Sequence, residues 1–112
     1  MEYAILIYRD ESRDAEFDWP QLDADYAAYF KQAAEAGVLR GGPRLQRAAL
    51  TTTVAVRDGR RLVTDGPFIE SREQLGGVFV IDCDDLDEAI DWATRCPGAS
   101  HGTVEVRPVE PN

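Results

Sequence analysis

The side chains best suited to chemistry surround a turn, Asp65-Gly66-Pro67-Phe68, in the second half of the 112-residue chain. Gly66 can adopt a positive φ and Pro67 fixes its own φ, so the turn is expected to hold Asp65 and the Phe68 ring in fixed directions. Burial beside Phe68 would favour the neutral form of Asp65, which could then act as a general acid or base. The alternative is that Asp65 only caps its own turn, as aspartate before glycine often does.

His101 is the other candidate catalytic residue, and it is the only histidine in the chain. It lies in a loop of small residues before the last strand-like segment. Histidine side chains exchange protons near neutral pH, so His101 could act as a proton shuttle. The alternative is an ordinary loop residue on the surface.

A second group of residues could bind a ligand. The candidates are Arg9, Phe68, Glu70, Glu73, Gly76 and Gly77. Arg9 shares the strand parity of Ile5 and Ile7, so its side chain could point into a cleft. Arginine forks match carboxylates, so Arg9, Arg44 and Arg47 could hold an anion, although Arg47 is expected to be solvated.

Glu70 and Glu73 lie between the turn and the glycine pair, where they could line a pocket rim or a solvated turn. Ser71 and Gln74 have the spacing of a capping box, which predicts one helical turn ending at Gly76. The glycine pair precedes a strand and no Walker lysine follows it, so a phosphate loop is disfavoured. A β-bulge or a close approach of two backbones is the expected reason for the glycines.

Hydrophobic patterns and capping residues predict the elements that position these side chains. The first strand is apolar at consecutive positions, which is typical of a strand in the middle of a sheet. Asp18 and Asp85 are the expected N-caps of two helices, which end at Gly37 and before Pro97. Asp58-Gly59 between two β-branched runs predicts a β-hairpin. Strands are predicted over residues 2–8, 51–57, 60–64, 78–83 and 103–109, with an irregular edge segment over 38–46.

This order predicts an α+β fold of the ferredoxin-like β-α-β-β-α-β type with an additional β-hairpin. In that fold both helices cover one face of the sheet. The other face also needs a cover, because segments 3–8 and 78–81 are apolar on both sides. A second copy of the chain would supply it, so we predict a homodimer. Tyr26, Tyr29 and Phe30 are expected to pack in the core or the dimer, with a ligand wall as the alternative.

Composition narrows the classes of protein to which the chain can belong. A length of 112 residues with 44% hydrophobic residues predicts one globular domain over residues 1–112. The net charge of −9 disfavours binding to nucleic acid and to anionic membranes. No apolar run approaches the roughly 20 residues of a membrane span, and signal-peptide features are missing, so a cytoplasmic location is predicted. Cys83 and Cys96 are expected to be buried thiols, and neither a metal site nor a cofactor is predicted.

Two segments resemble a known family. The string Val63-Thr64-Asp65-Gly66-Pro67-Phe68, followed by Glu70 and Glu73-Gln74-Leu75-Gly76-Gly77, resembles the signature of the DGPF-domain family, part of the YCII-related group. Segment 102–109 is similar to that family's closing strand, and the likeness runs over nearly the whole chain. The resemblance implies a dimeric α+β barrel, which agrees with the predicted homodimer.

The resemblance also implies two functions. Some members of the wider dimeric-barrel group isomerise or dehalogenate ring compounds, which implies a small aromatic or lactone-like ligand between sheet and helices, near Asp65, Phe68, Glu73 and Arg9. DGPF-family members often accompany extracytoplasmic-function sigma factors, which implies a regulatory protein as the alternative. The acidic charge would suit a basic partner.

YCII-related proteins are usually discussed in terms of a His–Asp pair in the cleft. No histidine occurs here in the first strand or helix, so that pair does not transfer. A third interpretation is a dimer whose turn is purely structural.

Overall fold

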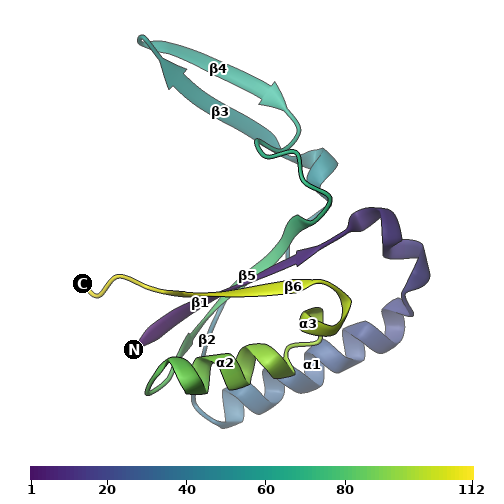
Figure 1. The fold of residues 1–112 in the computed structure, drawn as a ribbon, viewed down its shortest axis with the longest axis vertical. Coiled ribbons are helices and arrows are strands. Elements are labelled where there is room, and N and C mark those ends of the chain that lie inside the picture. The colour runs from purple at the N-terminus through teal and green to yellow at the C-terminus, as the bar shows by residue number, and fades with distance from the viewer.

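Four antiparallel strands form the central sheet, in the order β2-β5-β1-β6. The computed structural model describes residues 1–112 and bounds the strands at Glu2–Arg9 (β1), Leu39–Gly41 (β2), Gln74–Asp82 (β5) and Thr103–Pro108 (β6). Helix α1 (Trp19–Glu35) follows β1 in the chain, and helix α2 (Leu86–Arg95) follows β5 (Figure 1). This is the order of elements in a ferredoxin-like fold, so the predicted fold class is confirmed. Short segments η1 (Glu11–Glu16), η2 (Ala48–Leu50) and α3 (Gly98–His101) lie in the connections.

The helices begin and end where their capping residues predict. Asp18 accepts a hydrogen bond from the Gln21 amide at 3.2 Å, and Asp85 accepts one from the Glu88 amide at 2.9 Å. Gly37 follows α1 with φ of +77°, the left-handed conformation in which glycine avoids a side-chain clash. These three predictions are confirmed. No helix of the structure combines the length and the apolar character that crossing a bilayer requires.

The core lies between the helices and one face of the sheet. The Tyr29 hydroxyl on α1 donates to the backbone oxygen of Trp92 on α2 at 2.7 Å, and the Tyr29 ring meets Phe79 of β5 edge to face. Burying a large apolar side chain of this kind contributes about 1.5–3 kcal/mol. Cys83 and Cys96 are free and buried, as predicted, and burial raises the pKa of both thiols.

The opposite face of the sheet is less well covered. Side chains alternate between the two faces of a strand. Ile5 of β1 is fully buried against the helices, whereas its neighbours Ala4 and Leu6 point the other way and are only partly buried. The same holds for Val78 and Val80 of β5. This partly exposed set is apolar, which is the feature from which the sequence predicts a second copy of the chain.

Strand β5 begins earlier than the sequence predicts. Arg9 pairs with Gln74, so the strand starts at Gln74 and not at Val78, and the helical turn predicted from Ser71 and Gln74 is wrong. The Gln74 side-chain amide instead donates to the backbone oxygen of Ser71 at 2.7 Å, because pairing with β1 keeps the backbone extended. The register shifts opposite Ile7 and Tyr8 at Gly76, which confirms the predicted bulge.

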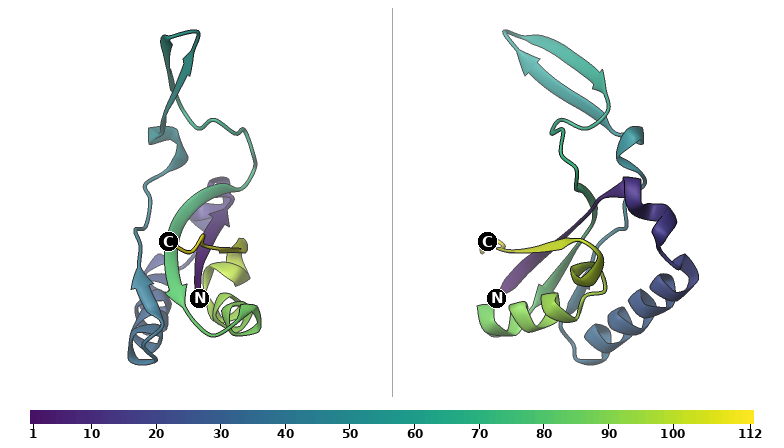
Figure 2. Two further views of the ribbon diagram at one scale, coloured as in Figure 1. Left: turned by 90° about the vertical axis from the view of Figure 1, so that its left-hand side faces the viewer. Right: turned by 45° about the vertical axis from the view of Figure 1, so that its right-hand side comes forward.

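The predicted hairpin is present as a separate element. Strands β3 (Thr52–Arg57) and β4 (Arg60–Asp65) pair only with each other, across a turn in which Asp58 and Gly59 have φ of 53° and 73°. We call residues Thr52–Asp65 the arm. It projects away from the sheet and helices in every view (Figures 1 and 2).

Candidate functional site

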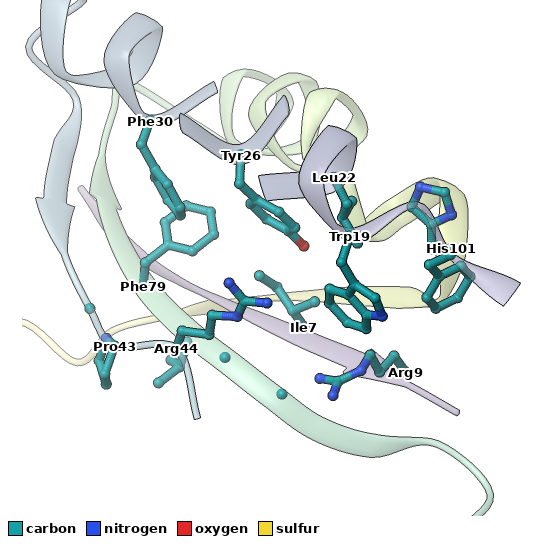
Figure 3. Close-up of a pocket in the computed structure, with 16 residues that line it drawn as sticks. Ile7, Arg9, Trp19, Leu22, Tyr26, Phe30, Pro43, Arg44, Phe79 and His101 are labelled. Atoms are coloured by element: carbon teal, nitrogen blue, oxygen red, sulfur yellow. The ribbon is translucent and has the colours of Figure 1, made fainter. Parts of the chain in front are cut away.

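A cavity of about 220 Å³ lies between α1 and the sheet. The close-up shows α1 above the cavity and β1 and β5 below it (Figure 3). Ile7, Leu22, Phe30 and Phe79 form much of its apolar wall, and the loop after β2 closes one side with Pro43. The cavity therefore occupies the space between sheet and helix in which the sequence predicts a pocket.

Two arginines approach the same tryptophan at this cavity. The guanidinium carbon of Arg9, at the end of β1, lies 5.4 Å from the centroid of the Trp19 ring. That of Arg44, after β2, lies 5.6 Å from it. Both distances fall within the range of about 6 Å in which a cation is attracted by an aromatic face. The Trp19 indole is held by a 2.9 Å hydrogen bond from Nε1 to the backbone oxygen of Asp14.

Arg9 is fixed by a fork-to-fork ion pair. Its Nε and Nη2 donate to the two carboxylate oxygens of Asp14 at 2.9 and 3.1 Å, and the two side chains are 20% and 14% exposed. The hydrogen bond with Asp14 raises the pKa of Arg9. Arg47 Nη1 also lies 3.6 Å from Asp14 Oδ2. Because Asp14 occupies only Nε and Nη2 of Arg9, the third nitrogen, Nη1, keeps its hydrogens for another acceptor.

Gly76 makes room for that third nitrogen. A Cβ added at Gly76 would lie 2.7 Å from Arg9 Nη1, closer than real Cβ contacts come. At Gly77 the nearest atom to an added Cβ would be the Pro43 oxygen at 3.6 Å, which is an ordinary contact. The bulge therefore places a residue without a side chain opposite the guanidinium.

Tyr26 brings a hydroxyl group into the cavity. Figure 3 shows its oxygen directed between Trp19 and Ile7. Burial raises the pKa of Tyr26, so the group is a neutral O–H at physiological pH. Its side-chain partner is the Cys96 thiol, at the long distance of 3.9 Å, so the hydroxyl can exchange this weak contact for a hydrogen bond to a ligand. A Cβ at Gly98 would lie 2.5 Å from this oxygen, so the glycine is needed there.

Arg44 and His101 lie at the cavity margin. Arg44 Nη1 donates to Asp23 of α1 at 2.9 Å, in an ion pair that is largely exposed. The His101 ring lies 5.0 Å from the Phe17 ring, at the end of α3, and its side chain is exposed. No group of three histidine, cysteine, aspartate or glutamate side chains converges to hold a metal ion.

The structure brings together only part of the predicted site. Arg9, Gly76, Gly77 and His101 all line the cavity. Asp65 and Glu70 are exposed, Phe68 is 81% exposed, and Glu73 accepts a hydrogen bond from Thr103 at 2.9 Å outside the cavity. Asp65 is exposed, so it lacks the burial on which its predicted acid–base role depends. The catalytic roles of Asp65 and His101 stay predictions.

The position of the turn explains this separation. Asp65 is the last residue of β4, so the turn lies where the arm returns to the sheet. The Gly66 amide donates to the Thr51 oxygen at 2.7 Å, and Thr53 Oγ1 donates to the Gly66 oxygen at 2.7 Å. Gly66 has φ of +98°, as its place in the turn predicts. These bonds join the two strands of the arm at its base, away from the cavity.

Sequence reasoning missed Trp19 and gave Tyr26 and Phe30 mainly to the core or the dimer. Tyr29 of the same stripe is buried in the core, whereas Tyr26 and Phe30 are partly buried, pack against the core as expected and also line the cavity. Helical spacing alone does not separate these outcomes, since all three residues lie on one side of α1. No sequence signal separates Tyr26 from Tyr29, since both carry a hydroxyl and that of Tyr29 bonds to the Trp92 backbone in the core.

Two comparisons place the chain among known sequences. The sequence model described as "YCII-related domain" matches residues 1–112. The uncharacterised protein R00369 of Rhizobium meliloti (strain 1021) is 39% identical over 114 residues, which cover 97% of this chain and 92% of that protein.

Proposed function

The chain belongs to the YCII-related family, and on this premise we propose that it binds a small, single-ring aromatic molecule that carries an anionic group. The binding site is the cavity between α1 and the sheet. One observation carries the proposal: two guanidinium groups, those of Arg9 and Arg44, each lie within 6 Å of the centroid of the Trp19 ring in a cavity that half of its lining residues make apolar.

The size of the cavity supports a single ring. An apolar cavity of about 150 Å³ holds a benzene molecule in another protein. A volume of about 220 Å³ therefore accommodates one ring with a carboxylate or a similar substituent. Larger, drug-sized ligands occupy pockets of about 300–1,000 Å³.

The charges support an anion. The chain as a whole carries −9, yet the charged side chains that line the cavity are those of Arg9 and Arg44. Their carboxylate partners, Asp14 and Asp23, are not among the residues that line it. Arg9 is held in place by Asp14 before any ligand arrives, so little side-chain entropy is lost when Nη1 donates to a ligand. The charge-assisted hydrogen bond that results is among the stronger kinds.

The other residues have distinct roles in this site. The Trp19 and Phe30 rings belong to the cavity wall against which a ligand ring can pack. The Tyr26 hydroxyl donates a hydrogen bond to the ligand. His101, at the margin, is in a position to exchange a proton with a bound ligand, and this is the one route to catalysis that we propose for the site.

We also propose that the ligand-binding unit is a homodimer. The apolar residues on the open face of the sheet, which include Leu6 and Val80, support a cover by a second copy. The regulatory alternative, in which the acidic chain contacts a basic partner such as a sigma factor, stays a prediction.

A thermal-shift and calorimetric titration tests the ligand. Benzoate, 4-hydroxybenzoate, the neutral analogue benzamide and a simple lactone are compared at equal concentrations. We expect the carboxylates to stabilise the protein and benzamide to do so less. A ligand present at 100 times its Kd stabilises by about 2.7 kcal/mol, which moves the Tm of a domain of this size by several degrees.

Arg44→Gln is the test variant, and Arg95→Gln is its matched control. Arg95 also lies over an indole ring, that of Trp92 at 3.8 Å, but outside the cavity. We expect Arg44→Gln to weaken benzoate binding and Arg95→Gln to leave it unchanged. Equal binding of benzamide and benzoate, or equal effects of the two variants, would contradict the proposal. Capture of a basic partner that neither variant alters would favour the regulatory alternative.

A further inference from the structure

The arm exposes apolar side chains that a folded monomer normally buries. Every residue of β4 is exposed, and Val54, Val56 and Val63 each have more than half of their surface exposed. A two-stranded hairpin is marginally stable by itself in water. Contiguous exposed apolar surface marks a site of interaction. The arm therefore requires a partner surface.

The exposed apolar side chains lie on one face of the arm. Val54 pairs with Val63 and Val56 with Arg61, so these four side chains share a face, and Val54, Val56 and Val63 make it mainly apolar. Phe68, just beyond the base of the arm, adds a ring that is also largely exposed. A one-sided strip of this kind is suited to packing against a second surface.

The area and shape of the chain indicate how large that surface is. The chain exposes 7786 Å², whereas a compact monomer of its mass exposes about 6,100 Å². Its radius of gyration is 15.8 Å, against about 13 Å for a compact domain of this length. The excess of about 1,700 Å² is twice the roughly 800 Å² that one partner buries in a standard interface. It is of the size that a stable dimer buries.

Charge indicates what the partner is. The tip of the arm carries Arg57, Arg60 and Arg61 beside a single acid, Asp58, although the whole chain has 21 acidic and 12 basic residues. A basic tip is attracted to an acidic surface. Another copy of this chain, with its net charge of −9, is such a surface.

We propose that the arm packs against a second copy of the chain. A dimer with two-fold symmetry exchanges both arms, so each copy buries the apolar strip of the other. The arm tip lies against the acidic body of the partner. This inference rests on the proposed homodimer and adds the element that holds it together; it is independent of the proposed ligand.

Analytical ultracentrifugation of the full chain, over a concentration series, tests the proposal. We expect a dimer whose dissociation constant rises by at least about 30-fold in Val54→Asp/Val56→Asp. Leu86→Asp is the control, because Leu86 on α2 is 48% exposed and lies outside the arm. Charge reversal at Arg57, Arg60 and Arg61 should weaken the dimer more at low salt than at high salt, because salt screens the attraction between exposed charges.

Folding of the variants is checked by circular dichroism and by the fluorescence of the two tryptophans, Trp19 and Trp92. No arm residue belongs to the buried core, so the body stays folded. The double variant Val54→Thr/Val56→Thr preserves strand propensity while adding hydroxyl groups. We expect it to weaken the dimer by about 10-fold. Because the hairpin keeps its strand propensity in this variant, that result would rule out loss of the hairpin as the cause.

Two results would overturn the inference, and they distinguish a failure of the arm's role from a failure of the homodimer proposal. A wild-type dimer that the arm variants leave intact would exclude the arm, while Leu6→Asp would still test the sheet face. A wild-type monomer at all concentrations would exclude both. Neither result bears on benzoate binding, which is measured separately.

Discussion

Both the cavity and the arm contain arginines and apolar side chains, but these side chains are packed together in the cavity and exposed in the arm. In the cavity, Arg9 and Arg44 come from separate parts of the chain, and each guanidinium carbon lies less than 6 Å from the centroid of the Trp19 ring. In the arm, Val56 and Arg57 are sequence neighbours, and both stay exposed. The cavity is therefore a product of tertiary packing, whereas the arm is a local structure that lacks its tertiary contacts. This difference predicts that substitutions in the two regions have separable effects.

The largest expected difference concerns stability. Phe79→Ala removes a ring that is 2% exposed and should lower the free energy of unfolding by about 3–5 kcal/mol. Leu62→Ala, at a half-exposed position of the arm, should change it by no more than about 0.5 kcal/mol in the monomer. Urea denaturation at low protein concentration measures both. Similar losses for the two variants would mean that the arm unfolds together with the core.

The regions should also differ at high pH. Burial raises the pKa of Tyr26 and Tyr29 above their ordinary value of about 10. The folded protein keeps these protons where the unfolded chain loses them, so their contribution is complete below pH 10 and is lost as the pH rises through the folded-state pKa. The slope approaches about 1.4 kcal/mol per pH unit for each tyrosine.

Unfolding measured between pH 9 and 11.5 tests this dependence. Tyr29→Phe should reduce the slope, whatever its effect on stability at neutral pH. The arm contains no tyrosine, so Leu62→Ala should leave the slope unchanged. A slope that is the same in Tyr29→Phe as in the wild type would contradict the role assigned to this side chain.

The signals that could be interpreted from sequence are local. The N-caps Asp18 and Asp85, the Asp58-Gly59 turn and the bulge at Gly76 each depend on residues within a few positions, and all were predicted. The central place of β1 followed from its unbroken apolar run. These features together define the ferredoxin-like order of elements and hence the existence of a space between α1 and the sheet.

The composition of the site could be predicted only in part. Whether a strand residue faces the cavity depends on register, and a bulge of one residue reverses it. The direction of the Trp19 ring depends on a bond to the Asp14 backbone that no spacing rule anticipates. The rigid turn at Asp65 was interpreted as a pocket rim because rigidity is readable from sequence. Its location is not, since the arm carries it away from the cavity.

A smaller effect tests the link between the bulge and the ligand. Gly76→Ala would displace the Arg9 guanidinium, whereas Gly77→Ala meets only an ordinary contact. We expect benzoate affinity to fall by about tenfold, or about 1.4 kcal/mol, in the first variant and to change little in the second. Isothermal titration calorimetry measures both. Loss of affinity in Gly77→Ala alone would contradict the proposed position of the ligand.

The smallest expected effect concerns the motif that first attracts attention in the sequence. Asp65 is exposed and lies outside the cavity of its own chain, so Asp65→Asn should leave both benzoate affinity and stability unchanged within about 0.5 kcal/mol. The same titration measures it, with Arg44→Gln as the variant that responds. If Asp65→Asn weakens binding all the same, we would infer that Asp65 acts on the cavity of a second copy, because it does not line the cavity of its own chain. The arm of one copy would then reach the cavity of the other, and the site and the arm would be one functional unit.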